Sequence, residues 1–273
     1  MTREFDRGTR FGALYDLLSA FAPIREITRV TDLGRADFFQ NYAAHSRPVI
    51  VQLRTAANER ALDDIENKHG DRVIKVRHGD YPDPDNYRPE RRLLNDMTLR
   101  EYIKSLRSLS ERDTPPYAGN FTLPIEFLGS LGASMPDYYS AERLEAPTVW
   151  LGVKGCITPL HRDSSDNFAI QLLGRKRWTI FPPQDAPYLY MSSVSQSKGM
   201  DFAASAIDLR RPDLARFPEF RNAKGITFEL CAGEMLYVPM GWGHYVENLE
   251  LSLMVNYWLS IVPSGVAALD GHK

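Results

Sequence analysis

The run Asn167-Phe168-Ala169-Ile170-Gln171-Leu172-Leu173-Gly174-Arg175-Lys176-Arg177-Trp178-Thr179-Ile180-Phe181 carries the clearest fold information in the sequence. Stretches rich in apolar and aromatic residues flank Gly174, and this pattern predicts two antiparallel strands joined by a turn. On the second strand, the alternation of side chains places Lys176, Trp178 and Ile180 on one face. A lysine that shares a face with tryptophan and isoleucine is expected to point inward.

Similar short runs follow one another from residue 148 onward. They are separated by Gly, Pro, Asn and Asp, and they lie at 148–153, 226–230, 234–238 and 251–259. Many short strands with such turns are typical of a β-sandwich or barrel. The stretch from 201 to 222 interrupts the pattern, with a weak helix expected near 211–217.

The part before residue 148 mixes both kinds of element. Apolar spacing predicts helices at 9–22, 32–42, 56–69 and 97–106, and strands at 47–53 and 73–76. Thr98 and Glu101 fit a capping box at the start of the last helix. Residues 79–92 are rich in proline and charge, which predicts a loop. We expect a single domain over 1–273, in which a mixed front half, 1–147, packs on a β core at 148–262.

Composition limits the class of protein. The chain has 273 residues, of which 43% are hydrophobic, so a buried core is readily formed. Its formal net charge of −2 gives no electrostatic case for nucleic acid or for a membrane surface. No apolar run approaches the roughly 20 residues of a spanning helix, and no apolar signal segment opens the chain. The two distant cysteines, Cys156 and Cys231, predict reduced thiols. We therefore expect a cytoplasmic protein.

The segment Thr158-Pro159-Leu160-His161-Arg162-Asp163 suggests a metal site. In an extended chain, residues two apart point the same way, so His161 and Asp163 can reach one ion together. His244 follows an apolar strand and two glycines, and it can supply a third ligand. Two histidines and a carboxylate form the facial triad of non-haem Fe(II) oxygenases. Taken alone, the tripeptide His161-Arg162-Asp163 is weak evidence, because either histidine could be a hydrogen-bonded core residue.

Two polar residues on apolar strands require partners. An inward Lys176 needs an anion, since an unpaired buried charge is costly, and a ligand carboxylate would serve. The alternative is a solvated lysine in a basic turn. Asn256 lies within the apolar last strand and needs a hydrogen-bond partner, either a ligand group or a backbone carbonyl.

Together these segments resemble the catalytic core of the cupin-like jumonji C family. The resemblance is carried by 158–163, Asn167-Phe168, 174–178, Phe181-Pro182-Pro183, 233–239, Trp242-Gly243-His244 and 255–258. Segments upstream, at 38–49 and 97–102, are also similar to this family, so that nearly the whole chain is covered. The resemblance implies a double-stranded β-helix, the jelly-roll core of cupins, with flanking helices.

The resemblance also assigns roles by position. His161, Asp163 and His244 match the Fe(II) ligands, and Lys176 matches the lysine that pairs with the far carboxylate of 2-oxoglutarate. Further matches to residues that contact this cosubstrate are Thr158, Asn167, Asn256 and, more loosely, Tyr117. The implied cofactors are Fe(II), 2-oxoglutarate and O2.

The implied activity is hydroxylation of an unactivated C–H, with release of succinate and CO2. We expect an amino-acid side chain in a protein or peptide as the substrate, because the asparaginyl hydroxylases of the family show the most similar pattern. The alternatives are an N-methyl demethylase of the same superfamily, a hydroxylase of a small molecule or nucleobase, a zinc or manganese cupin isomerase, and a non-catalytic metal-binding cupin. Isomerases of that kind usually carry His-x-His rather than His-x-Asp, which ranks them low.

The family's asparaginyl hydroxylases dimerise through a C-terminal helical extension. Only about fifteen residues follow Trp258 here, so the sequence does not support a homodimer formed by that route.

Overall fold

The structure is a computed structural model that describes residues 24–53, 60–78, 93–110, 114–135, 137–195 and 202–260. Several predictions made from the sequence lie outside these residues. They are the helix at 9–22, the first part of the helix at 56–69, the loop at 79–92 and the segment after 260.

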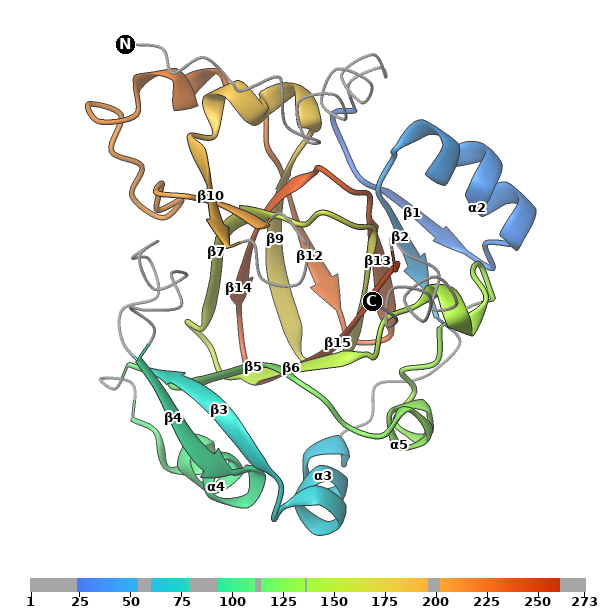
Figure 1. Cartoon of the computed structure of the whole chain (residues 1–273), viewed down its shortest axis with the longest axis vertical. Coiled ribbons are helices and arrows are strands. Elements are labelled where there is room, and N and C mark those ends of the chain that lie inside the picture. Colours follow the sequence, from blue (N-terminus) through green and yellow to red (C-terminus); the bar gives the residue numbers. More distant parts are fainter. Residues whose placement is uncertain are drawn as a thin grey trace, which may run out of the picture.

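Two sheets face each other, and they confirm the mainly β fold with a jelly-roll core (Figure 1). The larger sheet has the order β1-β2-β13-β8-β15-β6-β5-β3-β4. Its strands are β1 (Thr28–Thr31), β2 (Val49–Gln52), β3 (Val73–His78), β4 (Leu93–Thr98), β5 (Tyr117–Phe121), β6 (Thr148–Gly152), β8 (Asn167–Leu173), β13 (Glu234–Val238) and β15 (Ser252–Trp258). Only the β1–β2 pair within this sheet is parallel among the residues described.

The smaller sheet has the order β10-β11-β7-β14-β9-β12 and is antiparallel throughout its described pairs. Its strands are β7 (Ile157–Arg162), β9 (Arg175–Phe181), β10 (Met191–Ser195), β11 (Phe202–Ser205), β12 (Ile226–Cys231) and β14 (Gly243–Asn248). The first five strands of the chain, all within the front half, join the larger sheet beside the strands of the β core.

The strands on either side of Gly174 do not form the predicted hairpin. β8 pairs with β13 and β15 in the larger sheet, whereas β9 pairs with β14 and β12 in the smaller one. Gly174 has a φ of 68°, and a Cβ there would clash with the carbonyl oxygen of Leu251. Glycine is therefore required where the chain crosses from one sheet to the other. Local sequence does not distinguish this crossing from a turn within one sheet.

Four helices pack with the larger sheet in one hydrophobic cluster: α2 (Arg35–Asn41), α3 (Ala61–His69), α4 (Leu99–Ser108) and α5 (Ile125–Ser130). Phe38 of α2 and Tyr102 of α4 are fully buried in this cluster. The predicted capping box is present, since Thr98 and Glu101 exchange side-chain and backbone hydrogen bonds at the start of α4. The helices thus hold one face of the sheet rigid, so that its other face can carry the site.

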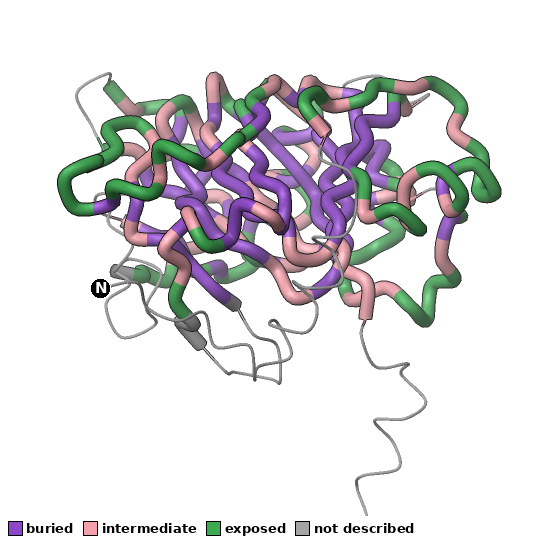
Figure 2. Tube along the Cα trace, turned by 90° about the horizontal axis from the view of Figure 1, so that it is seen from above, coloured by how far each residue is buried: buried purple, intermediate pink, exposed green. Residues whose placement is uncertain are grey.

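The opposite face of the larger sheet packs against the smaller sheet. Ile50 of β2 lies in this inner cluster with Trp178 and Ile180 of β9, while its neighbours Val49 and Val51 pack with the helices. Figure 2 shows the buried strands in the middle of the molecule and the exposed segments around them. We call the region between the two sheets the barrel interior.

The outer face of the smaller sheet is also covered. Phe181 and Tyr245 are buried there with Leu189, which follows the 3-10 helix η4 (Pro183–Tyr188). The other short 3-10 helices are η1 (Ala43–His45), η3 (Ala141–Arg143) and η6 (Pro218–Asn222). The helix predicted near 211–217 is wrong, because these residues form bends and turns that lead into η6. Within the described residues, no helix combines the length and the apolar character needed to cross a membrane.

Candidate metal and cosubstrate site

The two candidate histidines lie directly opposite each other on neighbouring strands. His161 of β7 pairs with His244 of β14, and Thr158 pairs with Val246. Between these pairs β7 advances three residues while β14 advances two, so β7 contains a β-bulge. The extra residue turns Thr158 and His161 toward the same side, which is the barrel interior. This feature is not visible in the spacing of the sequence.

Asp163, just after β7, completes a compact group of three side chains. One oxygen of Asp163 lies 3.7 Å from Nε2 of His161, and the other lies 3.7 Å from Nε2 of His244. Two atoms that bind the same ion at roughly 2.1 Å are at most about 4.2 Å apart. Each of these oxygen–nitrogen pairs is therefore close enough to bind one ion. In the part of the chain that the structure describes, this is the one group of three such residues positioned to hold a metal.

Hydrogen bonds orient both imidazoles toward the centre of this group. Nδ1 of His161 lies 2.8 Å from the carbonyl oxygen of Pro159, and Nδ1 of His244 lies 3.2 Å from that of Trp242. A carbonyl oxygen only accepts, so each Nδ1 carries a proton, and Nε2 is the nitrogen that a neutral ring would offer to a metal. Burial, followed by the neighbouring His244 ring, lowers the pKa of His161. Its neutral form is the one that a metal requires.

The Asp163 carboxylate is held by two donors. Oδ2 accepts from Nδ2 of Asn167 and from the indole Nε1 of Trp258, each at 3.0 Å. Burial by itself would raise the pKa of Asp163, but the two histidines and these hydrogen bonds bring it below the ordinary value. Asn256 in turn donates to Oδ1 of Asn167 at 2.7 Å. The chain from Asn256 through Asn167 therefore fixes the carboxylate in its ionised, metal-binding form.

Asp166 and Trp258 also help to hold the site residues in place, but no sequence motif predicts this role. Asp166 accepts from the Tyr237 hydroxyl at 2.9 Å and from the Met240 amide at 2.8 Å, which ties the loop after β7 to the turn before β14. The first segment includes Asp163, and the second leads into β14, which carries His244. For Trp258 the sequence gives one indication of such a role, its position two residues after Asn256 on the same strand face. For Asp166 the sequence gives no indication.

Lys176 lies at the start of β9, deep inside the barrel. Its side chain is wholly buried, and its ammonium donates to the Tyr117 hydroxyl at 3.1 Å. No carboxylate pairs with it among the described residues, and burial lowers the pKa of Lys176 to about 7. Tyr117, the looser match, is thus in direct contact with Lys176. An ammonium in this setting is suited to an anionic ligand group.

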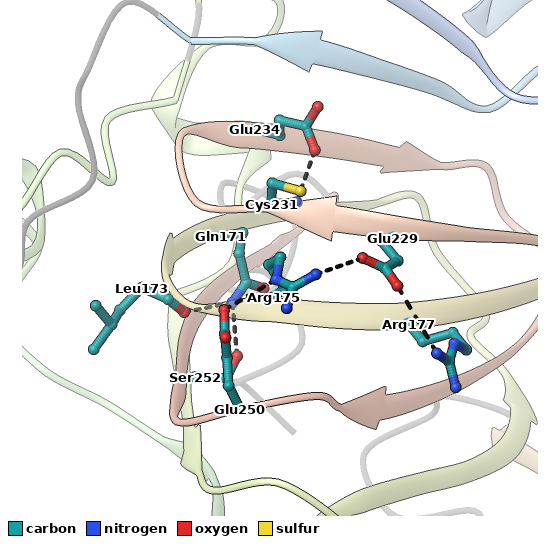
Figure 3. A network of polar contacts seen from close by, with 9 residues as sticks. All are labelled: Gln171, Leu173, Arg175, Arg177, Glu229, Cys231, Glu234, Glu250 and Ser252. Carbon is teal, nitrogen blue, oxygen red and sulfur yellow. Dashed lines mark hydrogen bonds and ion pairs between the residues drawn. The ribbon is translucent and has the colours of Figure 1, made fainter.

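The arginines beside Lys176 point the other way. Arg175 pairs with Glu229 at 2.9 Å and with Glu250 at 3.2 Å, and Arg177 lies 3.8 Å from Glu229 (Figure 3). All four side chains are well exposed. The solvated basic turn that the sequence also permitted therefore describes the arginines but not the lysine.

Buried polar atoms without partners indicate that the barrel interior is built for a polar ligand. In the described residues, Oδ1 of Asn256 and Nε1 of Trp178 have no hydrogen-bond partner. Thr158, which is 7% exposed, faces the same space opposite Val246. Native proteins rarely leave such groups unpaired, so a bound molecule or water is expected to satisfy them.

Two facing, largely antiparallel sheets that carry two histidines and a carboxylate between them define a cupin-type fold with the donor set of a mononuclear non-haem metal site. The model of the family described as "Cupin-like domain" matches residues 35–264. The chain therefore belongs to the cupin-like jumonji C family, as its motifs predicted.

Curated relatives include one that is named for the jumonji C domain. Human "HSPB1-associated protein 1" is 38% identical over 125 residues, which make up 45% of this chain and 25% of the relative. Zebrafish (Danio rerio) "Lysine-specific demethylase 8" is 25% identical over 250 residues, or 87% of this chain and 59% of the relative. "JmjC domain-containing protein D" of Dictyostelium discoideum is 28% identical over 256 residues, or 85% and 55%. The chain thus spans between a quarter and three fifths of the length of these relatives.

Proposed function

We propose that this protein is an Fe(II)- and 2-oxoglutarate-dependent oxygenase that hydroxylates an unactivated C–H of an amino-acid side chain in a protein or peptide. The observation that carries the proposal is the pairing of two sites in one barrel. Nε2 of His161, Nε2 of His244 and the ionised carboxylate of Asp163 can hold the metal, and a buried ammonium lies further along the same strands. His244 and the residue opposite Lys176 are four positions apart on β14, or roughly 13 Å along the strand.

Different residues would bind the metal and the cosubstrate. His161, Asp163 and His244 would hold Fe(II), which supplies the dioxygen chemistry that couples loss of CO2 from 2-oxoglutarate, giving succinate, to oxidation of the substrate C–H. Lys176 and Tyr117 would bind the far carboxylate of the cosubstrate. Thr158, Asn167 and Asn256 present polar groups around the space between. Trp258 and Asn167 keep Asp163 ionised and oriented, and the surrounding apolar cluster excludes water.

The charge of the chain bears on the class of substrate. The formal net charge of −2 favours a peptide, protein or small molecule over nucleic acid. We place the activity in the cytoplasm, where both free thiols and ferrous iron would stay reduced.

The test is turnover by the anaerobically reconstituted protein. We expect 2-oxoglutarate to be converted to succinate when O2 is admitted, and a peptide or amino-acid library to yield a product heavier by one oxygen, ~16 Da. His161→Ala and Asp163→Ala should lose Fe(II) and succinate formation together. His45→Ala, which alters an exposed histidine outside the site, should retain both. Full turnover by either site variant would disprove the metal assignment.

N-Methyl demethylation is a second candidate, favoured by the printed name of the zebrafish relative, "Lysine-specific demethylase 8". Both reactions begin with oxidation of a C–H. Demethylation then releases formaldehyde and a product lighter by one CH2, whereas hydroxylation retains the oxygen. Formaldehyde release in the same assay would select demethylation. Metal and 2-oxoglutarate binding without turnover of any candidate would instead favour a non-catalytic cupin.

A further inference from the structure

Asn248 faces the same buried space as Lys176. The two residues lie directly opposite each other where β14 pairs with β9. Opposite side chains in an antiparallel pair share a face, with Cβ atoms roughly 4.5–5.5 Å apart. Because Lys176 points into the barrel interior, the Asn248 amide lies beside it there. Asn248 matches no residue to which the sequence motifs assign a role.

The Asn248 amide lacks a partner although it is buried. The residue is 1% exposed, and neither Nδ2 nor Oδ1 has a hydrogen bond among the residues that the structure describes. Its main chain is fixed, since its N–H donates to Cys156 at 2.9 Å and its carbonyl accepts from Gly155 at 3.0 Å. β14 is also a central strand, between β7 and β9. The side chain therefore cannot turn to solvent, and its hydrogen-bonding capacity has to be met from inside the barrel.

The nearby side chains offer no substitute for a ligand. Leu230 of β12 lies on the other side of Lys176, where it is fully buried. The Cys156 thiol is also buried and already lies 3.6 Å from the Pro116 carbonyl oxygen. A thiol is a weak donor and a weak acceptor in any case. What the amide and the ammonium can share is an anion with two acceptor oxygens.

We propose that Asn248 is a third donor to the carboxylate that Lys176 and Tyr117 receive, and that it makes this end of the site selective for 2-oxo acids ending in a carboxylate. This inference rests on the proposed function. A carboxylate has two oxygens and about four lone-pair positions, so it can accept from an ammonium, a phenol and an amide at once. The three donors come from β5, β9 and β14, and those on β9 and β14 lie opposite each other on paired strands.

The test compares two ligands that differ only at the far end. Asn248→Leu keeps the size of the side chain and removes its hydrogen bonds. Calorimetric titrations of the Mn(II)-loaded chain without oxygen would use 2-oxoglutarate and 2-oxopentanoate, which has the same 2-oxo acid end but a methyl group in place of the carboxylate. We expect the Kd for 2-oxoglutarate to rise roughly 10- to 100-fold. The Kd for 2-oxopentanoate should change less than about threefold, since that ligand makes no such bond.

Two further variants serve as a control and as a second test at position 248. Thr179→Val lies on the outer face of β9 and should leave both affinities unchanged. Asn248→Asp keeps the shape but places a negative charge beside Lys176, which should weaken 2-oxoglutarate binding further. If Asn248→Leu does not fold, unchanged 2-oxoglutarate binding by Asn248→Asp would overturn the inference.

Equal loss of both ligands in Asn248→Leu would show a structural role, and unchanged binding of both would show no contact; either result overturns the inference. Failure of the wild-type protein to bind 2-oxoglutarate would refute the proposed function as well. Wild-type binding that Asn248→Leu fully retains would refute this inference alone.

Discussion

Replacing Lys176 with methionine should stabilise the protein while it abolishes cosubstrate binding. The side chain is wholly buried, and its charge meets no carboxylate among the described residues. Methionine has a similar length and no charge to desolvate. A buried lysine of this kind costs stability, and the proposed ligand accounts for its presence.

The size of the effect follows from the pKa of Lys176. Burial lowers this pKa from 10.5 to about 7. At about 1.36 kcal/mol for each pKa unit, the burial of the amine costs roughly 4 kcal/mol at pH 7. Losing the hydrogen bond to Tyr117 offsets about 1 kcal/mol of the gain. Lys176→Met should therefore raise the free energy of unfolding by up to about 3 kcal/mol, or the melting temperature by roughly 6–10 °C.

The gain should depend on pH in a defined direction. Between pH 7 and 10.5 the unfolded chain holds the lysine proton and the folded chain does not, so the stability of the wild-type protein rises with pH in this range. The advantage of Lys176→Met should accordingly be largest at or below pH 7 and shrink toward pH 10. Urea unfolding at several pH values measures it directly.

A matched control is Lys75→Met, which removes an exposed lysine from a surface ion pair with Asp96. It should change the free energy of unfolding by less than about 1 kcal/mol and leave 2-oxoglutarate binding intact. The reasoning would be refuted if Lys176→Met were less stable than the wild-type protein at pH 7, or if it bound 2-oxoglutarate with unchanged affinity.

Two other predictions concern the site. Because the pKa of Lys176 is about 7 without a ligand, binding of the far carboxylate above pH 7 has to include proton uptake. The Kd for 2-oxoglutarate should not change with pH below pH 7, and it should rise up to about tenfold per pH unit above pH 7. Calorimetry in buffers of different ionisation enthalpy would detect the proton that is taken up. A Kd that stays constant from pH 6 to 9 would contradict the prediction. Trp258→Phe removes one of the two hydrogen bonds to Asp163 and should weaken Mn(II) binding roughly 10-fold. Equal Mn(II) affinity of the variant and the wild-type protein would contradict this prediction.

The sequence predicts local features of this protein better than long-range ones. The inward face of Lys176, Trp178 and Ile180 follows from alternation, and the structure confirms that all three are buried. The capping box of α4 is equally local, and it is present. Gly174 was correctly identified as a break, but the sheet that each flanking strand joins depends on partners far along the chain.

The same division applies to the site. His161, Asp163 and His244 were identified from their types and motif, and the structure brings them together. The supporting residues Asp166 and Trp258 act through contacts with Tyr237, Met240 and Asp163, which are brought near only by folding. Asn248 was missed because a single polar residue at a strand end is ordinarily solvated. Its burial becomes apparent only when β14 is seen between two partners.

The bulge in β7 ties the placement of His161 to the register of the strand. If β7 kept all its residues but paired with β14 without the bulge, Thr158 and His161 would point to opposite sides, because residues three apart on a regular strand lie on opposite faces. A one-residue deletion between them would instead give a regular strand in which the two residues are two apart and still share a face. Variants that shorten this segment by one residue should therefore still direct both side chains into the barrel interior.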